Sequence, residues 1–124
     1  MVDDVLLVLG GRYPQFFPAG AMRLIGCYAG WLDLIDELCQ ALEAYLLCNP
    51  EAPEIEVVQV KEKFGELRFY VHGDDRHCRR LIALARARSL ITCEVCGANG
   101  AMIGDRWVSV RCSDHVQWQP TDSG

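Results

Sequence analysis

Apolar residues recur every three or four positions between Gly30 and Asn49, the period of an amphipathic α-helix. The polar residues between them are mostly acidic, and we expect them on the solvent side. The helix should end near Asn49-Pro50, because the residue before a proline avoids helical backbone angles. We therefore predict a helix over 31–48. Its predicted solvent face holds Asp33, Asp36, Glu37, Gln40 and Glu43.

Two later segments have the pattern of β-strands. Residues 55–60 are rich in β-branched side chains, which favour strands. In 66–72 the apolar residues Leu67, Phe69 and Val71 alternate with polar ones, as in a half-buried strand. A turn within 61–65 would join the two as a hairpin. A lone hairpin is marginal in water, so we expect it to pack on the helix.

A second helix is predicted over 75–89, with Asp75 in position to cap its first turn. One face of this helix is apolar, and the opposite face is rich in arginine. The arginine face is either a solvated surface or a docking surface for carboxylates or phosphates. Its members are Arg76, Arg79, Arg80 and Arg86.

The 124 residues fit one domain with a small appendage, and 51% of them are hydrophobic, enough for a real core. No apolar run approaches the roughly 18 residues of a membrane span, and the acidic start differs from a secretory signal. We therefore expect a cytoplasmic protein that contacts no membrane. Residues 1–56 hold nine acids against two bases, which disfavours general nucleic-acid binding and suits a basic protein partner.

Three of the seven cysteines cluster with a histidine as C-x2-C-x15-C-x2-H. Two such pairs across a loop are typical of a structural zinc site, and four protein ligands leave no position open for chemistry. We predict one structural Zn²⁺ in a treble-clef or zinc-ribbon-like module, with Trp107 capping its small core. The ligands would be Cys93, Cys96, Cys112 and His115; the remaining cysteines, expected as buried hydrophobes, are Cys27, Cys39, Cys48 and Cys78.

Together these elements predict an α+β fold: helix, β-hairpin, helix, then the zinc module. The predicted divisions are a core over 1–90, a zinc module over 91–118 and a flexible tail over 119–124.

Enzyme activity is not expected. A nuclease of the His-metal type needs a histidine on the hairpin between the two cysteine pairs, and this chain has none there. A second metal near His72, Asp74 and Asp75 would be the enzymatic alternative, although these residues also suit a turn and a helix cap.

Three blocks of the sequence resemble a group of small proteins of tailed phages and prophages: GWLDLIDELC, VVQVKEKFGELRFYV, and TCEVCGANG with a later Trp and C-x-x-H. The resemblance spans residues 13–115. Members of the group often carry Gly-Asp-Gly before the first Trp, where this chain has CYAG. The resemblance implies a phage or prophage origin and a bacterial host cytoplasm, but no activity.

Phage accessory proteins of this size frequently bind and block a host protein, including CRISPR-type defence effectors. We therefore expect a protein that inhibits or modulates a host protein machine, with the acidic residues Asp33, Asp36, Glu37 and Glu43 as its docking face. The alternative is a nucleic-acid-binding module that uses the arginine face of the second helix, with Arg106 and Arg111 from the zinc hairpin.

Overall fold

The computed structural model describes residues 2–18 and 25–117, so the predicted tail at 119–124 lies outside the described residues. Its centre is a three-stranded sheet in the order β1 (Ile25–Gly26), β2 (Glu56–Lys63) and β3 (Glu66–His72). β1 runs parallel to β2, and β2 runs antiparallel to β3. The mixed helix-and-sheet class predicted from the sequence is confirmed.

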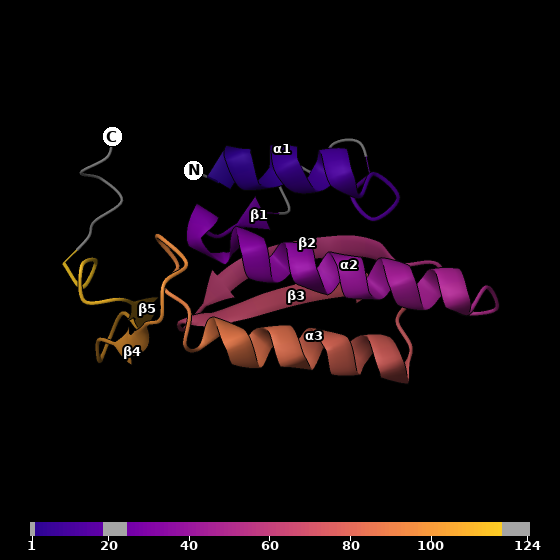
Figure 1. Ribbon diagram of the computed structural model, residues 1–124. Coiled ribbons are helices and arrows are strands. Elements are labelled where there is room, and N and C mark those ends of the chain that lie inside the picture. The colour runs from indigo at the N-terminus through magenta and orange to yellow at the C-terminus, as the bar shows by residue number, and fades with distance from the viewer. Residues whose placement is uncertain (1, 19–24, 118–124) are drawn as a thin grey trace.

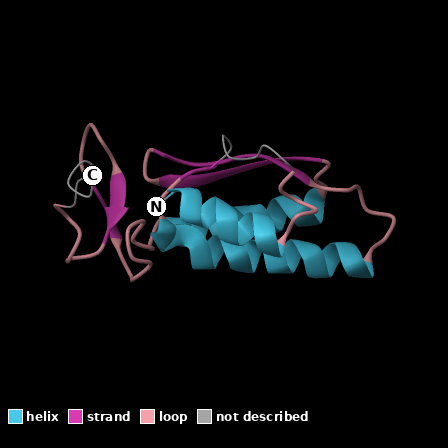
Figure 2. Cartoon of the chain, turned by 90° about the horizontal axis from the view of Figure 1, so that it is seen from above, coloured by secondary structure: helices cyan, strands magenta, loops and turns pink. Residues whose placement is uncertain are grey.

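Three helices cover one face of this sheet, as the two views of the chain show (Figures 1 and 2). They are α1 (Val2–Arg12), α2 (Leu32–Cys48) and α3 (Arg76–Ser89). A short 3-10 helix, η2 (Ala29–Trp31), leads directly into α2. The other face of the sheet carries none of these helices.

The strand β3 has the predicted alternation. Leu67 and Phe69 are buried against the helices, and Tyr70 on the opposite face is exposed. The strands extend further than predicted, because they pair as far as Lys63 with Glu66. The turn is therefore only Phe64-Gly65, shorter than the predicted 61–65.

The core is one cluster, in which side chains of all three helices pack on one another and on the sheet. Trp31 and Ile35 of the η2–α2 segment have no solvent exposure, and neither does Val60 of β2. Three of the four isolated cysteines are buried as predicted: Cys27, Cys39 and Cys78. The prediction is wrong for Cys48, which is exposed at the end of α2.

The predicted solvent face of α2 needs a correction at Asp36, which is only 8% exposed. Its carboxylate accepts hydrogen bonds from the Tyr13 hydroxyl at 2.8 Å and from Gln40 at 2.8 Å, and pairs with Arg12 at 3.0 Å. Burial alone would raise the pKa of Asp36, but these three partners together lower it. Asp36 therefore anchors the end of α1 and the loop after it.

Asp75 caps α3 as predicted, since its carboxylate accepts the backbone N–H of Cys78 at 2.9 Å. The same carboxylate accepts the Tyr45 hydroxyl at 2.6 Å, which ties the first turn of α3 to α2. Tyr45 also stacks on His77, with ring centroids 4.2 Å apart.

The Asp75 cap makes the stability of α3 depend on pH. The Tyr45 hydroxyl, and then the Cys78 N–H, lower the pKa of Asp75 from 3.8 to about 2. A carboxyl whose pKa is lowered by folding adds stability above its unfolded pKa and loses it as the pH falls through the folded value. Asp75→Asn keeps a capping side chain that does not titrate. The difference in Tm between wild type and D75N should therefore shrink between about pH 4 and about pH 2.

Thermal melts followed by circular dichroism would measure this difference at each pH. Any loss of the C-terminal fold in acid affects both proteins and cancels in the comparison. A difference in Tm that stays constant across this range would contradict the role given to the ionised cap.

The last described segment forms a separate two-stranded antiparallel hairpin, β4 (Ala101–Ile103) and β5 (Ser109–Arg111). It lies beyond the C-terminal end of α3, at one end of the sheet (Figure 1). The predicted cysteine and histidine ligands lie on either side of this hairpin in the sequence.

Candidate metal centre

The four predicted ligands meet in one cluster. The Sγ atoms of Cys93, Cys96 and Cys112 and a ring nitrogen of His115 all lie within 4.8 Å of one another. Cys96 Sγ is 3.6 Å from Cys112 Sγ, and His115 Nδ1 is 3.1 Å from Cys112 Sγ. One ion between them would touch all four, so the cluster is a candidate metal site.

A tight turn presents the first two ligands. The Gly97 N–H donates to the Cys93 carbonyl at 2.8 Å, and the Cys93 N–H donates to the Ala98 carbonyl at 2.8 Å. Gly97 has a φ of 84°, a conformation that glycine adopts without strain. The turn places the side chains of Cys93 and Cys96 on one side, where both reach the same ion.

The turn also prepares Cys93 to act as a ligand. Burial raises the pKa of the Cys93 thiol, but backbone N–H groups of Cys112, Cys96 and Val95 point at its sulfur and lower the pKa to about 6. Metals bind the thiolate and not the thiol. These backbone contacts therefore favour the thiolate form of Cys93 that a metal needs.

The hairpin β4–β5 returns the chain to the first pair of ligands. The Glu94 N–H donates to the Val110 carbonyl at 3.1 Å, which holds the turn against β5. Cys112 follows β5 directly, and the His115 N–H donates to the Cys112 carbonyl at 3.1 Å. Two main-chain turns thus bring C-x-x-C and C-x-x-H to one point.

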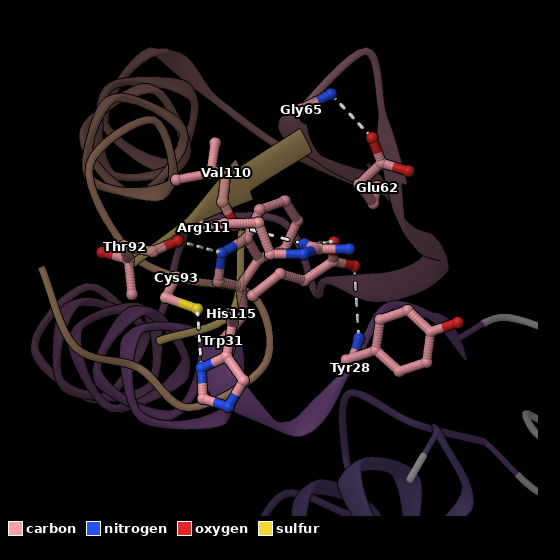
Figure 3. Close-up of polar contacts among 10 residues, drawn as sticks. Tyr28, Trp31, Glu62, Gly65, Thr92, Cys93, Val110, Arg111 and His115 are labelled. Atoms are coloured by element: carbon pink, nitrogen blue, oxygen red, sulfur yellow. Dashed lines mark hydrogen bonds and ion pairs between the residues drawn. The ribbon is translucent and has the colours of Figure 1, made fainter. Parts of the chain in front are cut away.

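The metal centre is docked on the core through η2. The Gly30 N–H donates to the Glu94 carbonyl at 2.8 Å, and the Trp31 Nε1–H donates to the Thr92 carbonyl at 2.9 Å. Figure 3 shows Trp31 beside Cys93 and His115, with its ring directed at Thr92. Trp31 has no solvent exposure, so the core and the centre enclose it together.

Gly30 is required at this contact because the two segments approach too closely for any side chain. A Cβ atom at position 30 would lie 2.3 Å from the carbonyl oxygens of both Cys93 and Glu94. No pattern in the sequence assigned Gly30 or Trp31 to the metal centre. The available signal was a glycine directly before a tryptophan at the start of a helix.

A buried ion pair lies beneath the centre. The Arg111 guanidinium meets the Glu94 carboxylate at 3.2 Å, and the two side chains are 9% and 4% exposed. Burial and the neighbouring Glu62 raise the pKa of Glu94, and Arg111 opposes them. Arg111 is thus part of the interior, and it is unavailable for the nucleic-acid contact considered for it from the sequence.

The prediction that Trp107 caps the small core is wrong. Its side chain is 89% exposed at the tip of the β4–β5 hairpin. The buried hydrophobic residue of the hairpin is Val110 of β5 instead. The rest of the module's interior consists mainly of Cys93, Cys112 and the Glu94–Arg111 pair. In a module this small, a metal bound by these ligands would take the place that hydrophobic side chains have in a larger domain.

The arginine face of α3 is exposed, but two of its members are engaged. Arg79 pairs with Asp74 at 3.6 Å, and Arg86 pairs with Glu66 of β3 at 3.3 Å. Arg76 and Arg80 border a shallow groove with Tyr45 and His77.

The predicted acidic face is also divided. Asp36 is buried, Glu37 pairs with Arg88 of α3, and Glu43 accepts a hydrogen bond from Gln15 at 2.7 Å. Asp33 is exposed. The structure therefore does not bring these four carboxylates together as one surface.

The alternative metal site near His72 is not assembled. Asp75 caps α3, and Asp74 pairs with Arg79. Among the described residues, the cluster of Cys93, Cys96, Cys112 and His115 is the one group of three or more ligands that meet.

Within residues 2–18 and 25–117, no helix combines the length and the apolar character that crossing a membrane requires. Comparisons of the chain with models of protein families, with curated proteins and with solved structures found no match. The function of this chain must therefore be inferred from its own residues and from the geometry of this centre.

Proposed function

We propose that this chain is a phage or prophage accessory protein that binds a host protein machine and inhibits or modulates it. One structural Zn²⁺ would hold its C-terminal module in shape. The observation that carries the proposal is the closed set of four protein ligands docked on the core. A metal with four protein ligands has no position for water or substrate, so we expect the protein to act by binding and not by catalysis.

Two of the distances between the ligands support zinc. Tetrahedral Zn²⁺ has Zn–S and Zn–N bonds of about 2.3 Å and about 2.0 Å, so its ligand atoms lie roughly 3.5–3.8 Å apart. Cys96 and Cys112 sulfurs are 3.6 Å apart, and Cys93 Sγ is 3.8 Å from His115 Nδ1, while Cys112 Sγ and His115 Nδ1 are closer at 3.1 Å. The turn after Cys93 and the β4–β5 hairpin are features that treble-clef and zinc-ribbon modules share, and we propose that the C-terminal segment is such a module.

A groove with an acidic rim is the surface we propose for the host protein. It has a volume of about 440 Å³ and lies between the loop after α1, the end of α2 and the start of β2. Phe16 and Ile55, which are 2% and 4% exposed, form its floor. Glu54 and Glu56 are exposed on its rim. An apolar floor with an acidic rim suits a basic protein surface.

The groove replaces the docking face predicted on α2. The groove keeps the acidic character expected of the docking face. It also involves Glu43 of that face, which positions Gln15 of the groove through their hydrogen bond of 2.7 Å. It also uses carboxylates whose side chains are free to meet a partner, unlike the buried Asp36.

Reversing three charges at the groove should abolish binding of the host protein. The variant is Glu43→Lys/Glu54→Lys/Glu56→Lys, and the test is affinity capture from nuclease-treated bacterial lysate, read by mass spectrometry. Wild type should recover one host protein in stoichiometric amount, and the variant should lose it by about 100-fold, because like charges placed across an interface cost several kcal/mol.

The matched control reverses three charges on α3, Arg76→Glu/Arg79→Glu/Arg80→Glu, and should still recover the same protein. Circular dichroism would establish that both variants fold. Equal recovery by wild type and the groove variant would refute the assignment of this surface.

A further inference from the structure

A second surface of this chain is rich in aromatic and basic side chains. It consists of the side of β2 and β3 that faces away from the helices, their turn, and the tip of the β4–β5 hairpin, and we call it the hairpin face. The helices pack on the opposite side of the sheet (Figure 2). Its exposed aromatic and basic residues are Lys63, Phe64, Tyr70, Arg106 and Trp107, and its half-buried basic residues are Lys61 and Arg68.

Phe64 occupies a backbone position that disfavours it. Phe64 and Gly65 both have positive φ, 57° and 78°, as a two-residue hairpin turn requires. Asn is the usual residue at the first of these positions, and a bulky side chain there is strained. The Phe64 side chain is also 65% exposed, so the fold gains little from burying it. A residue that costs stability and remains exposed indicates a binding role.

A groove of about 320 Å³ lies between the two hairpins. It is lined by Phe64 and Lys63 on the β2–β3 side and by Arg106 and Trp107 on the β4–β5 side. The two hairpins are in contact here, since a Cβ at Gly65 would lie 3.1 Å from Val108. The Glu94–Val110 hydrogen bond holds β4–β5 against the turn of the candidate metal centre, and a bound metal would further fix Trp107 relative to Phe64.

The charges on this face are mostly positive. Lys61 and Arg68 lie directly opposite each other on β2 and β3, a like-charge pair that is unfavourable unless an anion lies nearby. Glu66 pairs with Arg68 at 3.3 Å. Among the described residues, the Nε of Arg68 has no hydrogen-bond partner and is buried, so a phosphate would meet the outer nitrogens of this guanidinium. From Lys61 to the hairpin tip there are four cations against Glu62, Glu66 and Asp105, a surplus of one on a chain whose net charge is −5.

We propose that the hairpin face binds single-stranded nucleic acid. Bases would stack on Trp107 and Phe64, and the phosphates would lie along Lys63, Arg106 and the Lys61–Arg68 pair. Exposed aromatic planes beside a row of cations are what unpaired bases and their backbone need, because every base has a face on which an aromatic ring can stack. A duplex keeps its bases stacked and offers only its phosphates.

This activity goes beyond the proposed host-protein contact and uses a different surface. The acidic groove lies at the Glu56 end of β2, and the hairpin face ends beyond Lys63 at the other end of the same strand. Each surface can therefore be removed by mutation without touching the other.

The test uses a fluorescein-labelled oligonucleotide of 15 thymidines and anisotropy at low salt. Trp107→Ala should weaken binding about tenfold or more, the effect of removing one stacking platform. Arg76→Glu/Arg80→Glu, on α3, should change it less than twofold. For wild type, log K should fall with log salt concentration with a slope of about −2 to −3, as expected for three or four phosphate contacts to a single strand.

Tryptophan emission locates the contact. In a Trp118→Phe background the remaining tryptophans are Trp31, which has no solvent exposure, and Trp107, which is 89% exposed. Unlabelled oligonucleotide should therefore quench Trp107 selectively, and the quenching should disappear in Trp107→Phe.

Phe64→Asn gives a second readout that a purely structural residue would not produce. Asn suits the turn, so Tm should rise by about 3 °C while affinity for the oligonucleotide falls. A lower Tm together with unchanged affinity would overturn the role given to Phe64.

Absence of binding at micromolar protein and low salt would overturn the proposal, and so would binding that Arg76→Glu/Arg80→Glu abolishes and Trp107→Ala does not. A third pair of results would also overturn it: wild type binds no oligonucleotide, and Trp107→Ala no longer captures the host protein from nuclease-treated lysate. The hairpin face would then be a protein interface. If the acidic groove variant still captured the host protein, the proposed function would fail, but the oligonucleotide measurements would keep their meaning because they test a different surface.

Discussion

Cys112→Ser is expected to release the bound metal and unfold residues 93–115 while the helices and the three-stranded sheet stay folded. The reason is that the two parts are stabilised differently. No residue of the C-terminal segment belongs to the hydrophobic cluster of the core, whose described members end at Ala85. The C-terminal segment depends on its ligand set, and structural zinc contributes about 10–16 kcal/mol in isolated zinc-finger peptides.

Three measurements would follow this change. Elemental analysis of wild type should find one zinc per chain, and of Cys112→Ser almost none. Amide hydrogen exchange should become fast in 93–112, including the N–H groups of Cys93 and Gly97 that are hydrogen-bonded in the turn. The helical circular dichroism should remain close to that of wild type.

Cys48→Ser is the matched control, because it makes the same chemical change at an exposed cysteine on α2. It should leave metal content and hydrogen exchange unchanged. Normal protection of 93–112 in Cys112→Ser, or in wild type treated with a strong zinc chelator, would contradict a structural metal.

Gly30→Ala is expected to detach the metal module from the core without removing its metal. The added Cβ would lie 2.3 Å from two backbone carbonyl oxygens, and backbone atoms on both sides leave it no room. Separation would break the Gly30–Glu94 and Trp31–Thr92 hydrogen bonds and expose Trp31 to water. We expect the free energy of unfolding to fall by about 4 kcal/mol, in the range reached only by severe steric or burial defects.

The measurement is denaturant unfolding of wild type and G30A, with zinc content and tryptophan emission recorded for each. All four ligands lie within residues 93–115, so zinc should remain at one per chain. The emission of Trp31 should move to longer wavelength in a background where Trp107 and Trp118 are replaced by Phe.

Gly10→Ala is the same substitution at a position with free space, and we expect it to have the opposite effect on stability. A Cβ at Gly10 of α1 would meet nothing within 4 Å, and alanine is the better helix former by about 1 kcal/mol. G10A should therefore be slightly more stable than wild type. If G30A instead matched wild type, the docking of the module through η2 would be wrong.

Combining the two large effects tests whether they share one cause. In the Cys112→Ser background the module is already unfolded, so Gly30→Ala should cost little more. Strict additivity of the two losses would show that the close approach at Gly30 and the metal centre are independent.

The elements with strong local patterns were predictable from the sequence. The stripe of α2, the alternation of β3 and the Asp75 cap of α3 each depend on residues close together in the chain. The meeting of the four candidate ligands was also predictable, because two such pairs across a loop have the spacing typical of a metal site.

The elements that depend on distant partners were not predictable. The parallel pairing of β1 with β2 joins residues about 35 positions apart and has no local period. α1 contains Gly10 and Gly11, which weaken its own helical preference, and it is held by packing and by contacts such as Arg12 with Asp36.

The predicted roles of Asp36 and Trp107 failed for related reasons. Helical periodicity places polar residues on the solvent side, but here the Tyr13 hydroxyl and Arg12 satisfy the Asp36 carboxylate, and burial becomes acceptable. A tryptophan in a short hairpin suggests a core residue, but Trp107 lies at the tip, beyond the strands that could cover it.

The main-chain carbonyls of Thr92 and Glu94 fasten the C-terminal module to the rest of the chain, and the exposed side chain of Trp107 at the hairpin tip takes no part in this attachment. Residues 105–107 can therefore change during evolution without disturbing the frame that presents them, whereas Val108 contacts the other hairpin at Gly65. Two descendants of this chain could share one scaffold and differ in what the tip of the β4–β5 hairpin recognises. Exchanging residues 105–107 between such relatives would then alter recognition in a single step.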